Sequence, residues 1–402
     1  MSKNLVSFIK KNIDTLLIGS VFFFILIPFS AINPLNVDWI LDFSGISDFA
    51  FTWLGWVFYK STPFFQLPFF ATPDYGFGGG SNIVFTGSIP LLALTLKPFS
   101  NFLPYDFQYF GFWIYISFVL HAYFSKKILE IFTNDKILIG LMTILFITSP
   151  VFLHRIYIPH IGLLAQWLLL FSIYLLLRKN FCYKAWLINL TLALLVHGYL
   201  LMFCLILFAA DLIIKNKLKL NLNSLKAIYI FCSILVMMFI FGYFSADSAG
   251  PSGGFGYYSM NLNSLINPAG IHISEWSNVL PILASRLIEN FYPDYEGFNY
   301  LGLGLLILFP FALVKIKNLT FLIKENSKKT IVIFIMMLIV SLMAISNHIG
   351  IGEDTHVIKI SDEITSYLSS FRASGRFFWI NYYLIYCIIF IGVVKFYPRK
   401  FA

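Results

Sequence analysis

Charged residues are scarce in this chain: Asp, Glu, Lys and Arg make up 12% of its 402 residues, against about 25% in a soluble globular domain. Hydrophobic residues make up 59% of the sequence, and the mean hydropathy is +0.81. This balance excludes an ordinary soluble protein. Apolar runs of about 20 residues recur, which predicts helices that span a bilayer and not the alternating strands of a barrel.

Cysteine and nucleotide-binding motifs are also scarce. The cysteines Cys182, Cys204, Cys232 and Cys387 lie in or beside apolar segments, which argues against a disulfide framework and a CxxC metal site. A glycine-rich run at 76–80 has no preceding strand and no following Lys-Ser/Thr pair, so it does not indicate a phosphate loop. We predict no metal and no cofactor; a divalent cation is compatible with the sequence but not indicated by it.

The apolar segments predict an all-α polytopic membrane protein with about ten transmembrane helices. The expected spans are 14–32, 109–124, 137–153, 160–177, 185–197, 199–214, 227–244, 300–314, 330–346 and 377–394. The fifth and sixth are short enough to be a tilted or re-entrant pair. We expect one membrane-embedded domain over residues 1–402.

The distribution of basic residues predicts the orientation. With a cytoplasmic N-terminus, most of the 28 Lys and Arg are cytoplasmic, and the outer side keeps Lys60, Lys97, Arg155, Arg286, Lys359, Arg372 and Arg376. By the positive-inside rule, both termini are cytoplasmic and the outer loops are 33–108, 245–299 and 347–376. The same bias explains the net charge of +9 without a nucleic-acid partner.

The first outer loop is too long for a simple connection and too aromatic for disorder. We expect two short interfacial helices in it, Ser47 to Tyr59 and Ser88 to Leu96, with Ser47 and Ser88 as N-caps. The loop carries much of the acid in an acid-poor chain: Asp38, Asp42, Asp48, Asp74 and Asp106. Trp56, in the first helix, suits the membrane interface.

Asp48 is the preferred candidate for a general base, because it begins an interfacial helix that fixes its backbone. Its alternative role is to cap that helix. Asp38 and Asp42 have i,i+4 spacing and are expected to support the base or hold a cation.

The later outer loops carry candidate binding residues. Tyr295 and Glu296 lie in Tyr-Pro-Asp-Tyr-Glu-Gly-Phe-Asn (292–299); rings that stack on sugars and polar groups that bind hydroxyls suit a carbohydrate site, although an aromatic belt is the alternative. Arg372 and Arg376 are four residues apart and would share a helical face, which favours a phosphate clamp. The alternative is ion pairing with Asp362 or Glu363.

Two further ionisable residues have apolar surroundings. His197 is either functional or a neutral histidine that binds a backbone carbonyl near Gly198. Arg155 either snorkels to the outer interface or binds a lipid phosphate.

The sequence resembles a family of bacterial multi-spanning proteins of unassigned activity that is placed with the GT-C glycosyltransferases. The resemblance rests on Leu-Gly-Trp (54–56), Gly-Gly-Ser-Asn-Ile-Val-Phe-Thr (79–86), Ser-Ile-Pro-Leu-Leu-Ala (88–93), His-Gly-Tyr (197–199) and the segments 296–304 and 371–379. Its plan is also similar to that of phage-encoded glucosyltransferases that modify O-antigen. Gly87 stands where the family usually has Asp. If that Asp is the catalytic group, this chain is inactive or uses another acid.

The resemblance implies a GT-C-like fold and transfer of a sugar from a polyprenyl-phosphate donor to a surface glycan, such as the O-antigen of lipopolysaccharide. The reaction would take place at the periplasmic face of the inner membrane and invert the anomeric carbon. An Asp would be the base, and Arg372 and Arg376, with Arg155 or His197, would stabilise the leaving phosphate. The alternatives are an O-antigen polymerase or ligase and a lipid-linked glycan transporter. A transporter would require polar groups deep in several spans or duplicated halves.

Overall fold

The computed structural model describes residues 7, 10–41, 48–76, 79–158, 160–216, 222–245, 254–271, 274–286, 293–314 and 327–397. In these residues the protein is mostly helical, with three short two-stranded hairpins. Contacts divide the chain into two compact units. The first unit is Met1–Ile131, Ile139–Ile147 and Arg155–Ala246, and the second is Phe132–Leu138, Thr148–His154 and Asp247–Ala402. The single domain expected over 1–402 stays a prediction.

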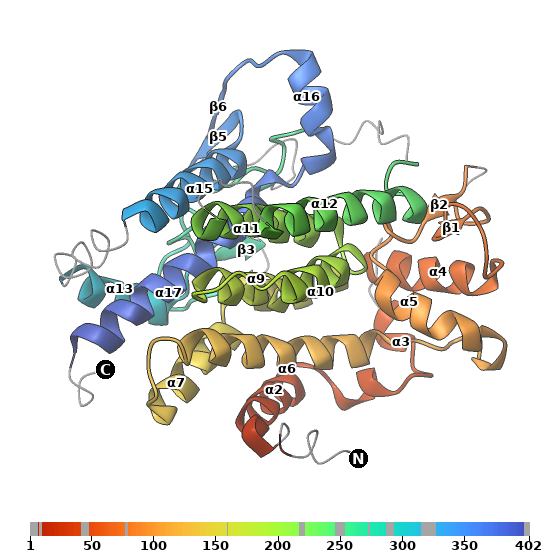
Figure 1. Cartoon of the computed structure of the whole chain (residues 1–402), viewed down its shortest axis with the longest axis horizontal. Coiled ribbons are helices and arrows are strands. Elements are labelled where there is room, and N and C mark those ends of the chain that lie inside the picture. Colours follow the sequence, from red (N-terminus) through yellow and green to blue (C-terminus); the bar gives the residue numbers. More distant parts are fainter. Residues whose placement is uncertain are drawn as a thin grey trace. The chain divides into compact units, whose positions relative to one another are not determined.

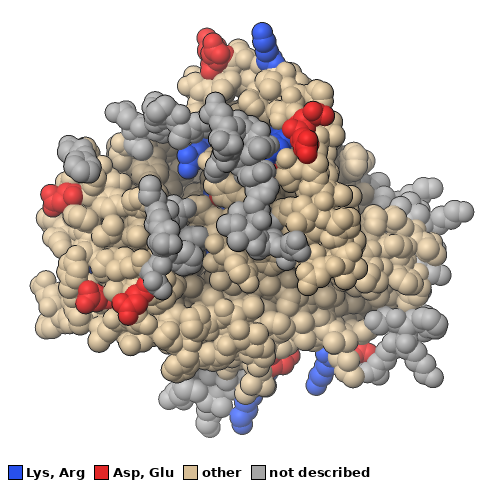
Figure 2. All heavy atoms as spheres, turned by 180° about the vertical axis from the view of Figure 1, so that it is seen from behind, with Lys and Arg blue, Asp and Glu red and all other residues tan. Residues whose placement is uncertain are grey.

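Helices that suit a bilayer occur in both units. Among the described residues, five helices are long and apolar enough to cross a membrane: Lys136–Tyr157, Gly198–Lys215, Leu222–Phe241, Lys328–Ile345 and Ser374–Lys395. On the face drawn in Figure 2, charged side chains form a few small groups and other residues make up most of the surface. These features agree with an all-α membrane protein. The number of ten spans, the inner membrane and the orientation stay predictions.

The first unit is built around α6 (Phe110–Leu129), beside α2 (Ile13–Leu26) and α9 (Trp167–Leu177) (Figure 1). Lys126 Nζ binds the Asp14 carboxylate at 2.7 Å, and Gln108 Nε2 donates to Ala31 O at 2.9 Å, so α2 and α6 are antiparallel. Trp113 Nε1 donates to Ile161 O at 3.1 Å, just before α9. Because Phe124 and Phe171 also stack near the other ends, α6 and α9 are parallel.

Three further helices of the first unit are α10 (Tyr183–Leu194), α11 (Gly198–Asn216) and α12 (Leu222–Phe241). Both α10 and α11 pack on α9 (Figure 1). Two helices, α7 (Lys136–Ile147) and α8 (Pro150–Tyr157), have residues in both units, and η3 (Ile161–Leu164) precedes α9. Of the fifth and sixth expected spans, the sixth is long enough to cross a membrane, whereas α10, within the fifth, has 12 residues. The tilted or re-entrant arrangement of this pair stays a prediction.

After η1 (Phe29–Ile32), the expected first outer loop contains α3 (Asp38–Leu41), α4 (Asp48–Ser61), β1 (Ala71–Thr72), β2 (Ser81–Asn82), α5 (Pro90–Leu96) and η2 (Lys97–Phe102). Both expected helices are present, but the predicted Ser88 cap is wrong. Ile89 occupies the N-cap position without a side-chain cap bond, because the Ser88 hydroxyl donates to Thr52 O at 2.6 Å instead. Ser47 lies outside the described residues.

The second unit contains β3 (Ala269–Ile271), β4 (Ser274–Glu275), η4 (Pro293–Tyr295), α13 (Leu303–Val314), α15 (Ser327–Ile345), β5 (His348–Ile351), β6 (Asp354–Val357), α16 (Asp362–Leu368), η5 (Ser369–Phe371), η6 (Ser374–Phe378) and α17 (Trp379–Phe396). In the β5–β6 hairpin, His348 pairs with Val357. Both α13 and α15 pack against α17, and α15 also packs on η6. Gly392 permits the close approach to α13, because a Cβ there would lie 3.0 Å from Ala312 Cβ.

Candidate functional site

In the first unit, hydroxyl groups join the segments that carry the family resemblance. Thr86 Oγ1 and Ser88 Oγ are 2.6 Å apart, and Thr52 Oγ1 donates to Thr86 O at 3.1 Å. Gly55 allows α4 to lie against them, because its added Cβ would come within 2.4 Å of both hydroxyl oxygens. The Leu-Gly-Trp segment and the Thr-Gly-Ser turn therefore form one packed cluster.

Gly87 occupies a backbone conformation that favours glycine. Its φ is +71°, and an added Cβ would lie 3.2 Å from Thr52 Oγ1. Ile89, two residues later, also has a positive φ, +51°, which is costly for a β-branched residue. The turn at Gly87 is thus shaped for a residue without a side chain, whatever acid stands there in relatives.

The structure describes only some of the acidic side chains of the first loop. Asp38 is exposed in α3, and its backbone N–H donates to Asn36 Oδ1 at 3.0 Å. Asp48 begins α4 as expected, but its side chain, like the whole of Asp42, lies outside the described residues. Asp74 is exposed. The choice of base among these acids stays a prediction.

Trp56 is fully buried and donates from Nε1 to Phe107 O at 3.1 Å, so it packs inside the first loop. Its neighbour in the same loop, Lys97, was not singled out from the sequence and is 3% exposed. Lys97 Nζ donates to Tyr59 O at 2.7 Å and lies 3.7 Å from the centroid of the Tyr59 ring. Burial lowers the pKa of Lys97 to about 8. This lysine fixes the end of α4 by binding a terminal carbonyl.

His197 and Arg155 have defined surroundings in the first unit. His197 Nδ1 accepts a hydrogen bond from Tyr199 N at 3.2 Å. This contact involves one ring nitrogen, and the choice between a functional and a structural His197 stays a prediction. Arg155 is 1% exposed, which argues against snorkelling into water.

In the second unit, two predicted site residues form a buried ion pair. Arg376 Nε donates to Glu296 Oε2 at 2.7 Å, and Nη2 binds Oε1 of the same carboxylate. The two residues are 7% and 2% exposed. Asp362 and Glu363 were the alternative partners considered from the sequence, but the acid that Arg376 binds is Glu296, because Arg376 lies in η6 and faces the interior of its unit. Glu296 was expected to bind substrate, but its carboxylate is taken by this pair.

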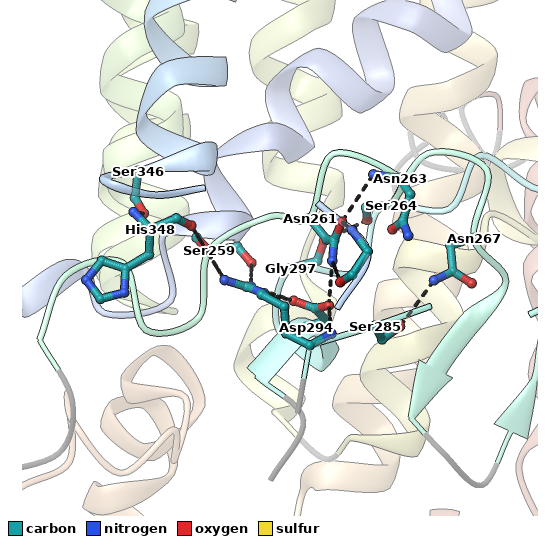
Figure 3. A network of polar contacts seen from close by, with 12 residues as sticks. Ser259, Asn261, Asn263, Ser264, Asn267, Ser285, Asp294, Gly297, Ser346 and His348 are labelled. Carbon is teal, nitrogen blue, oxygen red and sulfur yellow. Dashed lines mark hydrogen bonds and ion pairs between the residues drawn. The ribbon is translucent and has the colours of Figure 1, made fainter. Parts of the chain in front are cut away.

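A second buried ion pair lies two residues away in the same motif. Arg286 is 1% exposed, and its Nε lies 2.5 Å from Asp294 Oδ1. Asn261 Nδ2 also donates to Asp294, at 2.9 Å, and Arg286 Nη1 donates to Ser259 Oγ at 2.9 Å. Ser259 in turn donates to His348 O at 2.6 Å, so the network in Figure 3 ties three separate segments together.

Glycines let these segments approach each other. An added Cβ on Gly375 would lie 2.5 Å from Gly297 Cα, and one on Gly297 would lie 2.4 Å from Ser259 O. A Cβ closer than 3.0 Å to a backbone atom would push the two chain segments away from each other. The two Arg–carboxylate pairs can therefore form only because small residues stand at 297 and 375.

Tyr258, Tyr295 and Arg372 lie over the buried pairs. The rings of Tyr258 and Tyr295 meet edge to face with centroids 5.6 Å apart, and both side chains are half-buried. Arg372 Cζ lies 5.6 Å from the centroid of the Tyr258 ring, and this arginine is exposed. Burial, and next the charge of Glu296, raises the pKa of Tyr295, so its hydroxyl stays protonated and can donate.

The predicted shared face of Arg372 and Arg376 is wrong. The last helix, α17, begins at Trp379, and Arg376 lies in the preceding 3-10 turn, where residues four apart no longer align. One guanidinium is consequently exposed and the other buried. The candidate anion site has a single available arginine, Arg372, with Arg376 as a positioning residue.

A small polar cavity adjoins the network. Its volume is about 10 Å³, room for roughly one water molecule. It is lined by Asn261, Asn263, Ser264, Asn267, Ala269, Ser285, Asp294 and Phe298. Within the described ranges, no group of three or more His, Cys, Asp or Glu side chains could hold a metal.

The residues missed from the sequence are Arg286, Asp294 and Tyr258. Two signals were available: Asp294 alternates with Glu296 around Tyr295, and Arg286 is one of the few basic residues in the expected outer loops. An acid pair in one motif and scarce outer arginines predict pairing, but the sequence does not say which arginine binds which acid.

A family model with the description "Domain of unknown function (DUF6311)" matches residues 16–402. No curated protein and no solved structure matches the chain.

Proposed function

The chain belongs to the DUF6311 family, and we propose that it is an integral-membrane glycosyltransferase of the GT-C type. It takes a sugar from a polyprenyl-phosphate donor and transfers it to a surface glycan such as O-antigen. The proposed location is the periplasmic face of a bacterial inner membrane, with both termini cytoplasmic.

The observation that supports this proposal best is the position of Arg372 over Tyr258, beside Tyr295. A planar guanidinium held against a ring keeps its N–H donors directed outward, which suits the oxygens of a phosphate. Half-buried tyrosines supply faces for a sugar ring and hydroxyl donors for its oxygens. Both nearby carboxylates are neutralised by arginines, so the cluster does not repel an anionic donor.

In the proposed reaction, the acceptor hydroxyl oxygen forms a bond to the anomeric carbon as the bond from that carbon to the phosphate oxygen breaks. The leaving phosphate takes the bonding electron pair, and Arg372 stabilises its added charge. The proton of the acceptor passes to a carboxylate, for which Asp48 is the first choice and Asp42 the second. Attack opposite to the leaving group inverts the anomeric carbon.

The test uses membranes that contain the full chain, a panel of polyprenyl-phosphate hexoses and lipopolysaccharide with O-antigen. We expect one donor to add a hexose, seen as a mass increase of the released glycan. Arg372→Ala should lower the rate about 100-fold, the usual cost of losing one charge-stabilising donor. Arg372→Lys should restore it only partly, because the planar fork is lost.

Lys226→Ala is the matched control, since Lys226 is also a cation that lies over a tyrosine ring, Tyr183, but in the first unit. It should retain full activity. Normal transfer by Arg372→Ala would exclude the anion site, and no hexose addition with any donor by the folded native chain would exclude the transferase.

A further inference from the structure

A groove lies on the surface of the first unit. It has a volume of about 460 Å³ and lies between α6 and α9. Its walls are aromatic: Phe124 and Phe171 stack with centroids 4.5 Å apart and an interplanar angle of 23°, and Tyr123 and Tyr174 lie beside them. This volume falls in the range of small-molecule sites, about 300–1,000 Å³.

Basic side chains gather at the same end of the two helices. Lys127 lines the groove, with Nζ 5.5 Å from the centroid of the Tyr123 ring. Arg178 is exposed, and its Cζ lies 5.8 Å from the centroid of the Tyr174 ring. Because α6 and α9 are parallel, both cations lie at the C-terminal ends of their helices, which the predicted topology assigns to the cytoplasmic side.

One acid of the groove, Glu130, competes for Lys127. Glu130 also lines the groove, and its Oε2 accepts from Lys127 Nζ at 2.7 Å. The neighbouring Lys126 is held by Asp14 at 2.7 Å. The groove thus has aromatic walls; at its rim Lys127 is paired with Glu130, and Arg178 lies over the ring of the lining residue Tyr174.

We propose that this groove binds an anionic glycerophospholipid. Its headgroup phosphate binds Lys127 and Arg178, partly displacing Glu130, and an acyl chain lies along Phe124 and Phe171. Tyrosine rings with adjacent Lys and Arg are the combination that recognises headgroups at a membrane surface. Inorganic phosphate would leave the aromatic walls without a partner. The inference does not depend on the proposed sugar transfer.

Native mass spectrometry of the purified full chain in detergent tests this site. Dioleoylphosphatidylglycerol is the anionic probe and dioleoylphosphatidylcholine the zwitterionic control. We expect preferential retention of phosphatidylglycerol. Lys127→Gln should lower that retention about five-fold, the effect of one basic residue near an anionic lipid, and should leave phosphatidylcholine unchanged. Lys184→Gln, an exposed lysine of α10 outside the groove, should behave as the native chain.

Glu130→Gln is the second variant and does not remove a cation. It should retain at least as much phosphatidylglycerol as the native chain, because Lys127 loses its competitor. The proposal is overturned if Lys127→Gln and the native chain retain phosphatidylglycerol equally. It is also overturned if Glu130→Gln lowers retention, or if inorganic phosphate displaces the lipid. Gel filtration confirms that each variant is folded, and should Lys127→Gln fail to fold, the Glu130→Gln result decides.

Discussion

At the scale of single residues, the carboxylates of Asp294 and Glu296 in the second unit each form an ion pair with an arginine. Glu296 is neutralised by a fork of hydrogen bonds from Arg376 within a buried environment. Removing one partner of such a pair leaves an uncompensated buried charge, which costs about 3–5 kcal/mol. The ion pair of Glu296 and Arg376 therefore holds two distant segments of the second unit together.

We expect Glu296→Gln to lower the free energy of unfolding by about 3–5 kcal/mol, because Arg376 keeps its charge but loses its counter-ion. Chemical denaturation in detergent, followed by tryptophan fluorescence, measures the change. The control is Glu363→Gln, an exposed acid of α16, which should change stability by less than about 0.5 kcal/mol. Equal stability of the two variants would show that the Glu296–Arg376 ion pair contributes little to the free energy of unfolding.

Asp48→Asn separates a catalytic from a capping role. Asparagine caps a helix about as well as aspartate but cannot accept a proton as a base. We expect the variant to insert and unfold like the native chain while hexose transfer is abolished. Full activity of Asp48→Asn would transfer the assignment to Asp42, for which Asp42→Asn is the next measurement.

At the scale of elements, backbone contact between loop segments positions the site. Gly375, in η6, and Gly297, just after η4, meet without side chains between them. This contact brings Arg376 to Glu296, 80 residues apart in sequence. Helix formation alone does not bring Arg376 and Glu296 together.

Gly375→Ala should therefore destabilise the protein by about 1–3 kcal/mol, the usual cost of forcing extra volume into a packed region. Gly140→Ala in α7 is the matched control, because no atom lies within 4 Å of its added Cβ. It should stabilise the protein by about 0.5–1 kcal/mol, since alanine favours helix. Thermal unfolding in detergent compares the two, and a neutral Gly375→Ala would contradict the close approach.

At the scale of the whole molecule, the membrane orientation remains to be measured. Antiparallel α2 and α6, and parallel α6 and α9, fit the predicted order of spans. Large exposed apolar side chains, such as Phe239 at 74% and Phe334 at 66%, are the kind that lipid would cover.

We expect a membrane-impermeant thiol reagent added from outside to label Ser81→Cys and Ser252→Cys but not Lys217→Cys. The basis is the excess of Lys and Arg on the predicted cytoplasmic side. The experiment uses a chain whose four cysteines are replaced by serine or alanine. Labelling of Lys217→Cys alone would reverse the predicted orientation.

The sequence by itself determined the class of protein and most of its helices. Apolar runs and scarce charges are local properties, so they predict membrane helices without knowledge of the partners. The interfacial helix that begins at Asp48, and the second one between Pro90 and Leu96, followed from acid and proline signals within a few residues. Tyr295, Glu296, Arg372 and Arg376 were also selected from the sequence, and the second unit brings them together.

Only the tertiary structure decided what these residues do. Whether Arg376 binds Glu296 or an acid nearer in sequence depends on long-range packing, because an ion pair needs two side chains at one point in space. The same packing directs Ser88 to Thr52 O and away from helix capping. Arg372 is exposed and Arg376 buried because a 3-10 turn, and not an α-helix, separates them. That turn is held by contact with Gly297, which lies too far away in sequence for local patterns to reveal.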